Sequence, residues 1–390
     1  MAVSKFYTLF WIIYFPTCIA FYSTIQFYYI DEILTLLLIC YTFIHVRTEG
    51  NRWKLNEVKA YSAIMVFYVV YSLIMAVNVS TAVWLDLQQQ VRPYAVFYCT
   101  WLLAPQFSGR QKNMILGAMG VTIILYFLSI YFNLTHESMG TTIIGQLSLI
   151  MSMSIYCFKP KSRKSVMIAI LVLTLGLLSE KSKFYGEYVV FIALVLFLRE
   201  KVNFAKPKTM LQFVVLVSAV LFFSWAKFNS YYIEGFERSE TEIEARPVTY
   251  LVGLKILGDY FPLGSGLGTF ACNAAAEFYS PLYYKYELSG HWGLSPDNPM
   301  FLADCFYPVL AQYGIVGIVL FAIFWRRRIK ETKYIVDERY YKMALMCILA
   351  LAIESVADTS YLSGKGMGFF MLLAICLNMN NRQKKINYKS

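Results

Sequence analysis

Long apolar runs recur along the whole of this sequence, and each is close to the length that crosses a lipid bilayer. A membrane-spanning helix needs about 20 mostly apolar residues. The chain has 390 residues, of which 58% are hydrophobic and only 15% are charged. A single soluble core stops growing near ~250–300 residues, so it could not bury this much apolar surface. The sequence therefore predicts an all-α polytopic membrane protein.

The apolar runs predict about twelve transmembrane helices in a single transmembrane domain, residues 1–390. We expect the first run to be retained, because it lacks a small-residue cleavage site. One large loop, 228–301, separates the ninth and tenth spans and contains turn signals and a predicted short helix, Val248–Leu257. The predicted spans are 6–22, 32–46, 61–79, 93–107, 114–132, 141–158, 165–179, 184–198, 210–227, 302–325, 342–357 and 366–379.

Basic residues divide unevenly between alternate loops of this topology. One set of loops, which includes both termini, holds 26 of the 35 Lys and Arg residues, while the other set holds 18 of the 24 acidic residues. The positive-inside rule places the first set and both termini in the cytoplasm, and the 228–301 loop outside. The run WRRRIK, 325–330, then reads as a cytoplasmic anchor, and nucleic-acid binding is the poorer interpretation of the net charge of +11.

Some basic residues go against this trend, because we expect them at the outer face. Lys181 and Lys183 stand in the run SEKSKFYGEY, 179–188. Cations of this kind suit phosphate oxygens and would stabilise a departing pyrophosphate without a metal ion. The simpler interpretation is pairing with a nearby acid, as Lys183 could pair with Glu187 one helical turn later, or snorkelling to a headgroup. The remaining outer cations are Arg92, Lys227, Arg238, Arg246, Lys255, Lys285 and Lys365. Simple pairing is the favoured interpretation for Lys227, Arg238 and Lys285.

The segment PLGSGLGTF, 262–270, is rich in glycine but lacks the spacing of a dinucleotide-binding fingerprint. Gly264 and Gly266 indicate either a tight turn that leads to a closely packed segment or a backbone that passes close to a ligand. These two interpretations are about equally favoured by the sequence.

Three acid–base candidates precede the tenth span. His291, Asp297 and Asp304 could each accept a proton from an attacking sugar hydroxyl. A solvated loop histidine is the simpler interpretation of His291, and a turn cap is the simpler interpretation of Asp297. Asp304 lies at the mouth of an apolar span, where a carboxylate is costly unless it has a partner or a task. The few histidines and scattered cysteines predict no metal site.

Several segments together resemble a known family. The segments DLQQQVRPY (86–94) and LLSEKSKFYG resemble its Arg-bearing segment and its basic motif. Three further segments resemble the C-terminal half of the family's members: ARPVTYLVGLKILGDYFPLGSGLGTF, ADCFYPVLAQYGIVGIVLF and LAIESVADTSYLSGKGMGFF. The family is that of the O-antigen and capsular polysaccharide polymerases (Wzy-type), which are related to the O-antigen ligases. The resemblance covers most of the chain in order and topology.

The resemblance implies a glycosyltransferase of GT-C type at the outer face of the bacterial inner membrane. It would join oligosaccharide repeat units that are carried on undecaprenyl pyrophosphate, with the growing chain as donor and the incoming unit as acceptor. It implies no metal or other cofactor. Besides this substrate and membrane lipid, a chain-length regulator and a flippase are candidate partners.

Carried onto this sequence, the resemblance implies catalytic roles for basic residues and leaves the general base open. The catalytic candidates are Arg246, Lys183, Lys181, Asp304, His291 and Asp297. The candidates for binding pyrophosphate or glycan are Arg92, Lys255, Lys365, Glu187, Gly264, Gly266 and Tyr250. The family often has Arg where this chain has Lys181, and a His-Asn pair where it has Ala303–Asp304.

Two other functions remain open from the sequence. An O-antigen ligase, which transfers finished polymer to a lipid A core, would use the same leaving group and so the same cations. A flippase or transporter would fit the number of spans. It should also show an internal repeat and polar groups near the membrane midplane, and the sequence shows neither.

Overall fold

The computed structural model describes residues 2–21, 29–46, 51–132, 137–198, 200–202 and 245–379, with isolated residues between 203 and 244. All regular secondary structure in these ranges is helical, which confirms the predicted all-α class. Five helical segments are long and apolar enough to cross a membrane: Ala2–Ala20, Arg52–Met75, Gly109–Tyr131, Tyr307–Thr332 and Glu338–Ala357. Ile143–Phe158 and Gly364–Leu377 are shorter apolar helices.

The described chain up to residue 198 forms one series of helices. They are α1 (Ala2–Tyr14) with the π-helical turn η1 (Phe15–Ala20), α3 (Ile30–His45), α4 (Arg52–Met75), α5 (Ser80–Leu103), α6 (Gly109–Tyr131), α7 (Glu137–Phe158), α8 (Arg163–Leu175) with η2 (Gly176–Ser179), and α9 (Ser182–Ile192) with η3 (Ala193–Phe197). Each overlaps a predicted span. The predicted span 210–227 lies mostly outside the described residues.

The remaining helices follow residue 244. They are α12 (Ala245–Asp259), α13 (Asn273–Glu277), α14 (Pro281–Lys285), the short 3-10 helices η5 (Leu288–Gly290) and η6 (Tyr307–Tyr313), then α15 (Gly314–Thr332), α16 (Glu338–Ala357) and α17 (Gly364–Leu377). The helix predicted over Val248–Leu257 is confirmed, since it lies within α12.

The start of α5 corrects the predicted topology. We expected 80–92 to be an outer loop, but the helix begins at Ser80 and contains Asp86 and Arg92. Both side chains are buried, and both are satisfied by other parts of the chain. Asp86 accepts a hydrogen bond from the backbone N–H of Gly268 at 2.8 Å. The hydropathy pattern did not predict a helix over 80–92 because this stretch contains polar side chains. In the structure these side chains bind groups inside the protein rather than water.

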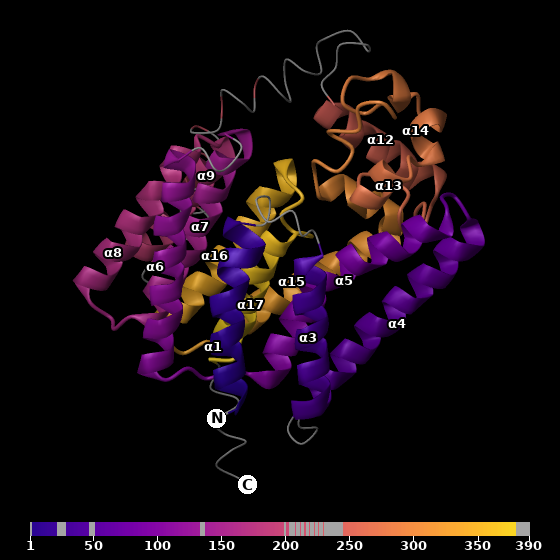
Figure 1. Ribbon diagram of the computed structural model, residues 1–390. Coiled ribbons are helices and arrows are strands. Elements are labelled where there is room, and N and C mark those ends of the chain that lie inside the picture. The colour runs from indigo at the N-terminus through magenta and orange to yellow at the C-terminus, as the bar shows by residue number, and fades with distance from the viewer. Residues whose placement is uncertain are drawn as a thin grey trace.

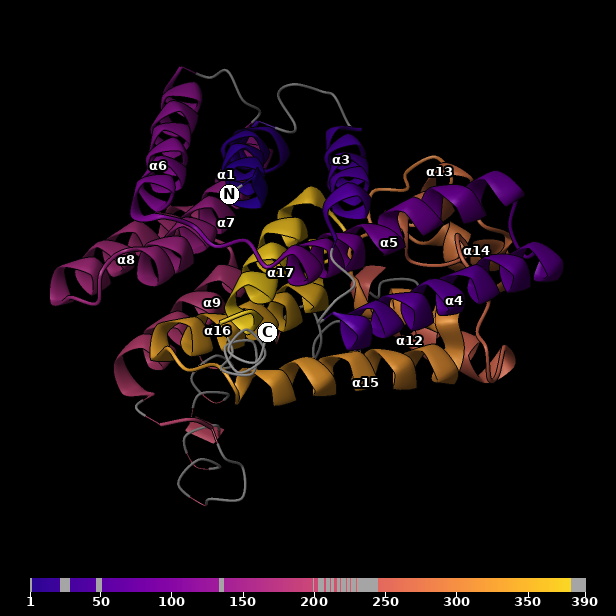
Figure 2. The same cartoon turned by 90° about the horizontal axis from the view of Figure 1, so that it is seen from below.

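Helix α17 lies at the centre of the molecule and packs against α5 and α16. Nearly all of its residues are buried. Figure 2 shows α6 to α9 on one side of α16 and α17, and α4, α5 and α12 to α14 on the other. In Figure 1, α12, α13 and α14 gather at one end of the molecule, whereas α1 begins at the opposite end. The described part of the large loop is therefore concentrated at one end.

The end of α15 contains a buried arginine that the sequence did not single out. We interpreted the run WRRRIK as a cytoplasmic anchor, and within it the Arg328 side chain is fully buried. Its guanidinium lies over the rings of Trp101 and Phe97 and donates to both carboxylate oxygens of Glu57, at 2.7 and 2.9 Å. Both contacts come from one guanidinium nitrogen, Nη2, which also lies 3.2 Å from Glu331, so two carboxylates offset the cost of burying the charge. Arg328 therefore connects α15 to α4 and α5.

The glycine-rich segment is packed against helices by its backbone. Gly264 has a φ of +85°, and a Cβ there would meet the backbone nitrogen of Gly314 at 2.3 Å. Gly266 has a φ of +92°, and its Cβ would meet the Ser72 hydroxyl at 2.9 Å. Only glycine fits this backbone and this spacing without strain.

We predict that Gly264→Ala lowers the free energy of unfolding by about 2–4 kcal/mol, through backbone strain and overpacking. Gly258→Ala is the matched control, because it lies in α12 with open space around its Cβ position. That change should be neutral or stabilising by up to about 1 kcal/mol. Thermal unfolding of the two purified variants in detergent measures the difference. Equal melting temperatures would contradict the packing described here.

Candidate functional site

The connection between α16 and α17, residues 354–365, carries the polar groups around which the site is built (hereafter the α16–α17 connection). Helix α16 ends when the backbone becomes extended at Asp358, whose carboxylate accepts hydrogen bonds from the backbone and hydroxyl of Ser360 at 2.7 and 2.8 Å. Ser363 then caps α17 by accepting from the backbone N–H of Lys365 at 3.3 Å. These local bonds favour a defined turn over continued helix.

Lys183 of α9 binds this connection directly. Its ammonium lies 2.6 Å from Glu354 and also pairs with Asp358. Burial alone would raise the pKa of the Asp358 carboxyl, but the charges of Lys183 and Lys365 outweigh burial and hold that pKa below its usual range. Asp358 is therefore ionised at neutral pH. Its contribution to stability is present above the ordinary Asp pKa of about 4 and is lost as the pH falls below it.

Arg92 binds the other end of the α16–α17 connection from α5. Its guanidinium lies 2.5 Å from Asp31, also pairs with Glu32, and donates to the carbonyl of Leu362 at 3.1 Å. The Arg92 side chain is only 7% exposed. Two carboxylates of α3 thus neutralise one buried guanidinium, so Arg92 does not present an open anion site in this structure.

Arg246 reaches the same region from the first turn of α12. It pairs with Asp304, and both side chains are about a quarter exposed or less. One turn along α12, Tyr250 donates to the carbonyl of Val356 at 2.8 Å. The hydroxyl of Thr359 donates to the carbonyl of Ala303 at 3.2 Å, next to Asp304. The Arg246–Asp304 pair is therefore attached on both sides to the α16–α17 connection.

Glu187 is the one candidate in this region whose carboxylate oxygens both lack a hydrogen-bond partner, although the side chain is fully buried. The predicted pair between Lys183 and Glu187 is wrong, because Lys183 turns to Glu354 and Asp358 instead. A third carboxylate beside one lysine would leave uncompensated buried charge, so we infer that Glu187 holds its proton.

Three further cations have no carboxylate partner among the described residues. Lys181 precedes α9 and is partly exposed, Lys255 is exposed on α12, and Lys365 lies in the first turn of α17 near Asp358. Their side chains remain available to an anionic ligand, unlike the guanidinium of Arg92.

Gly264 and Gly266 fit the interpretation as a tight turn. The backbone N–H groups of residues 264–269 all donate within the protein, for example Gly266 to the carbonyl of Gln312 at 2.9 Å and Leu267 to the Ser72 hydroxyl at 2.7 Å. No donor in this segment is left to hold a phosphate. Packing alone accounts for both glycines, which corrects their assignment to ligand binding.

His291 and Asp297 lie in the turns that follow α14. His291 is partly exposed at the end of η5, and Asp297 is exposed between Ser295 and Asn298. Neither takes part in the ion pairs around the α16–α17 connection. Of the three acid–base candidates, the structure brings only Asp304 to one of the predicted cations.

Several residues of this site were missing from the predicted set. Asp31, Glu32 and Asp358 supply carboxylates, while Gln146 donates to Glu354 at 3.3 Å and to the Ser360 hydroxyl at 2.8 Å. The carboxylates flank the ends of apolar spans, which is the same signal that identified Asp304. Gln146 is an uncharged residue within a span, and the sequence offers no comparable signal for it.

The described residues contain no group of three His, Cys, Asp or Glu side chains that could hold a metal ion. The paired cations and carboxylates of the site can bind an anion electrostatically and can transfer a proton. Comparison of the sequence with family models and with curated proteins gives no match. The resemblance to the polysaccharide polymerases accordingly stays a prediction.

Because Glu187 holds its proton, we expect the same Glu→Gln substitution to change the free energy of unfolding differently at Glu187 and at Glu354. Glu187→Gln should leave the free energy of unfolding nearly unchanged, because an amide resembles the neutral acid. Glu354→Gln should cost about 2 kcal/mol or more, because it removes a buried charge that is paired with Lys183. Thermal unfolding of both variants in detergent compares them. Equal destabilisation by the two substitutions would mean that Glu187 is ionised in the folded protein.

Proposed function

We propose that this protein is a polysaccharide polymerase, a glycosyltransferase of GT-C type with about twelve spans in the bacterial inner membrane. It joins repeat units carried on undecaprenyl pyrophosphate at the periplasmic face, for O-antigen, capsule or exopolysaccharide. Both termini face the cytoplasm. One observation supports this most: cations from three separate helices, Arg92, Lys183 and Arg246, all contact or adjoin the α16–α17 connection.

In the proposed reaction, a hydroxyl oxygen of the acceptor sugar attacks the anomeric carbon of the donor. The bond between that carbon and the pyrophosphate oxygen breaks, and undecaprenyl pyrophosphate departs with the electron pair. Arg246 and Lys183 stabilise the charge that develops on the leaving group, assisted by Lys181, Lys255 and Lys365. The hydroxyl proton passes to a carboxylate.

The carboxylates that hold these cations in the resting protein have a defined role in this proposal. A pyrophosphate carries several negative charges and competes with Asp304 for Arg246, and with Asp358 for Lys183. Once displaced from its cation, a carboxylate is free to accept the proton of the attacking hydroxyl. Asp304 is the stronger candidate for the base, since its pair is the more exposed of the two.

A second candidate function is a lipid-linked oligosaccharide flippase coupled to protons. The buried, unpartnered carboxyl of Glu187 favours it, because ionisable groups within membrane helices often belong to proton pathways. An O-antigen ligase is a third candidate, since it expels the same leaving group. The glycolipids of a deletion strain separate the three. Polymerase loss leaves single-unit glycolipid, ligase loss leaves long chains on the carrier, and flippase loss leaves units at the cytoplasmic face.

Arg246→Ala, expressed in the deletion strain, should lower polymer formation by about 100-fold or more, the effect of removing one group that stabilises an oxyanion. Lys285→Ala is the control, because Lys285 is an exposed cation of the same loop whose ammonium contacts the Tyr260 hydroxyl at 3.4 Å. It should support normal polymer. Glycolipid gels report chain length, and immunoblots report abundance. Normal polymer from Arg246→Ala at equal abundance would remove Arg246 from the mechanism.

A further inference from the structure

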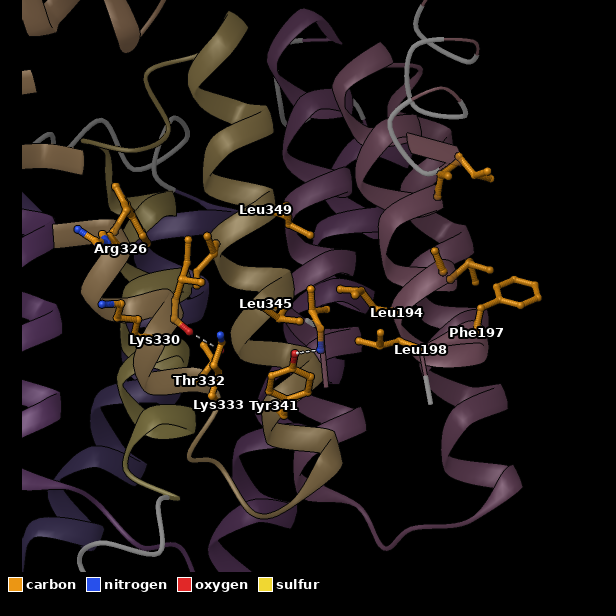
Figure 3. Close-up of a pocket in the computed structure, with 18 of the residues that line it drawn as sticks. Leu194, Phe197, Leu198, Arg326, Lys330, Thr332, Lys333, Tyr341, Leu345 and Leu349 are labelled. Carbon is orange, nitrogen blue, oxygen red and sulfur yellow. Dashed lines mark hydrogen bonds between the residues drawn. The ribbon is translucent and has the colours of Figure 1, made fainter. Parts of the chain in front are cut away.

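A groove of about 1100 Å³ runs along the molecule away from the α16–α17 connection. Figure 3 shows Leu345 and Leu349 of α16 between the labelled residues of α15 on one side and Leu194 and Leu198 on the other. The floor of the groove is therefore α16, and its walls are α15 and α9 with η3. Leu211 and Val215 also line it.

The length of the groove matches one leaflet of a bilayer. On α15 its lining runs from Ala322 to Thr332, which is about 15 Å at 1.5 Å per residue. The hydrocarbon core of a bilayer is ~30 Å thick. All lining residues of α15 belong to the half of that helix that ends near Thr332, and those of α16 begin at Tyr341 near its start. The groove thus occupies the half of the protein that the positive-inside rule assigns to the cytoplasm.

The walls divide into an apolar part and a basic part. The walls formed by α9, η3 and α16 are almost entirely apolar, with Ile192, Leu194, Phe197, Leu345 and Ile348 among them. Three basic residues line the groove at spacings of four and three: Arg326 and Lys330 of α15, and Lys333 directly after its end. This spacing places them on one helix face.

The three basic side chains are exposed, and no ion pair joins them to a carboxylate among the described residues. In Figure 3 the charged ends of Arg326 and Lys330 point away from α16, so the stems of these side chains, and not their charges, lie nearest the apolar floor. Long basic side chains commonly reach toward the headgroup layer in this way. An apolar channel with unpaired positive charge beside it is complementary to a lipid with a negative headgroup.

We propose that this groove binds an anionic glycerophospholipid of the cytoplasmic leaflet. Its acyl chains lie over α16, and its phosphate contacts the basic stripe of Arg326, Lys330 and Lys333. The site rests on the orientation given under the proposed function, but not on the glycosyltransferase activity. A polyprenyl pyrophosphate held at Lys183 would carry its charge at the opposite end of the protein, so the headgroup chemistry separates this site from that substrate.

The test uses the full-length protein in a neutral detergent with added dioleoyl phosphatidylglycerol or dioleoyl phosphatidylcholine, and native mass spectrometry counts the lipid retained. We expect the anionic lipid to bind about tenfold more tightly than the zwitterionic one, since each basic residue near a surface adds attraction. The variant R326Q/K330Q/K333Q should lose that preference. K5Q/R163Q/K164Q is the matched control, because it also replaces one Arg and two Lys, at exposed positions outside the groove.

A second variant tests the apolar part without changing charge. Ala322→Phe adds bulk to an exposed position of the wall, so it should lower retention of both lipids severalfold. Equal retention of both lipids by the unmodified protein would overturn the proposal. So would equal losses in the two triple variants, or the appearance of a lipid-free dimer, because a second copy would then occupy the groove.

Discussion

Charge that is buried in an apolar protein must be paired, and this requirement organises the structure. Lys183, Arg92 and Arg246 come from three helices far apart in sequence, and each reaches carboxylates at or beside the same connection. Removing a partner from such a pair costs more than the pair itself contributes, because an uncompensated charge is left behind. Ion pairs of Lys183 therefore hold α9 to the end of α16, whereas α5 and α12 are joined to the connection by the hydrogen bonds of Arg92 to Leu362 and of Tyr250 to Val356.

The same pairing determines what the site can do. Arg92, Lys183 and Arg246 are each already paired with one or two carboxylates in the absence of a ligand. A polyanionic ligand would have to displace a carboxylate, which couples ligand binding to the release of a base. Arg92 is the least available for such an exchange, because it is nearly fully buried between Asp31, Glu32 and Leu362. We therefore regard Arg92 as a residue that positions the connection.

The local sequence pattern predicted those features of the fold that depend on neighbouring residues alone. The all-helical class and the helix predicted over Val248–Leu257 follow from apolar runs and turn signals, whereas Lys183 and Arg246 were grouped only through the family resemblance. The first half of α5 was missed because Asp86 and Arg92 are satisfied by Gly268, Asp31 and Leu362, which only the folded chain brings near. Lys183 was assigned to Glu187, its neighbour on the helix, because sequence spacing cannot reveal a better partner more than 150 residues away.

The central claim is that these paired cations lie at the non-cytoplasmic face. Alkaline phosphatase is active only outside the cytoplasm, so fusions of this enzyme after Asp297 and after Tyr334 test the claim directly. Asp297 belongs to the exposed turns near Asp304, and Tyr334 follows α15 at the other end of that helix. We predict activity from the first fusion and none from the second. The reverse pattern would place the α16–α17 connection in the cytoplasm and contradict the account.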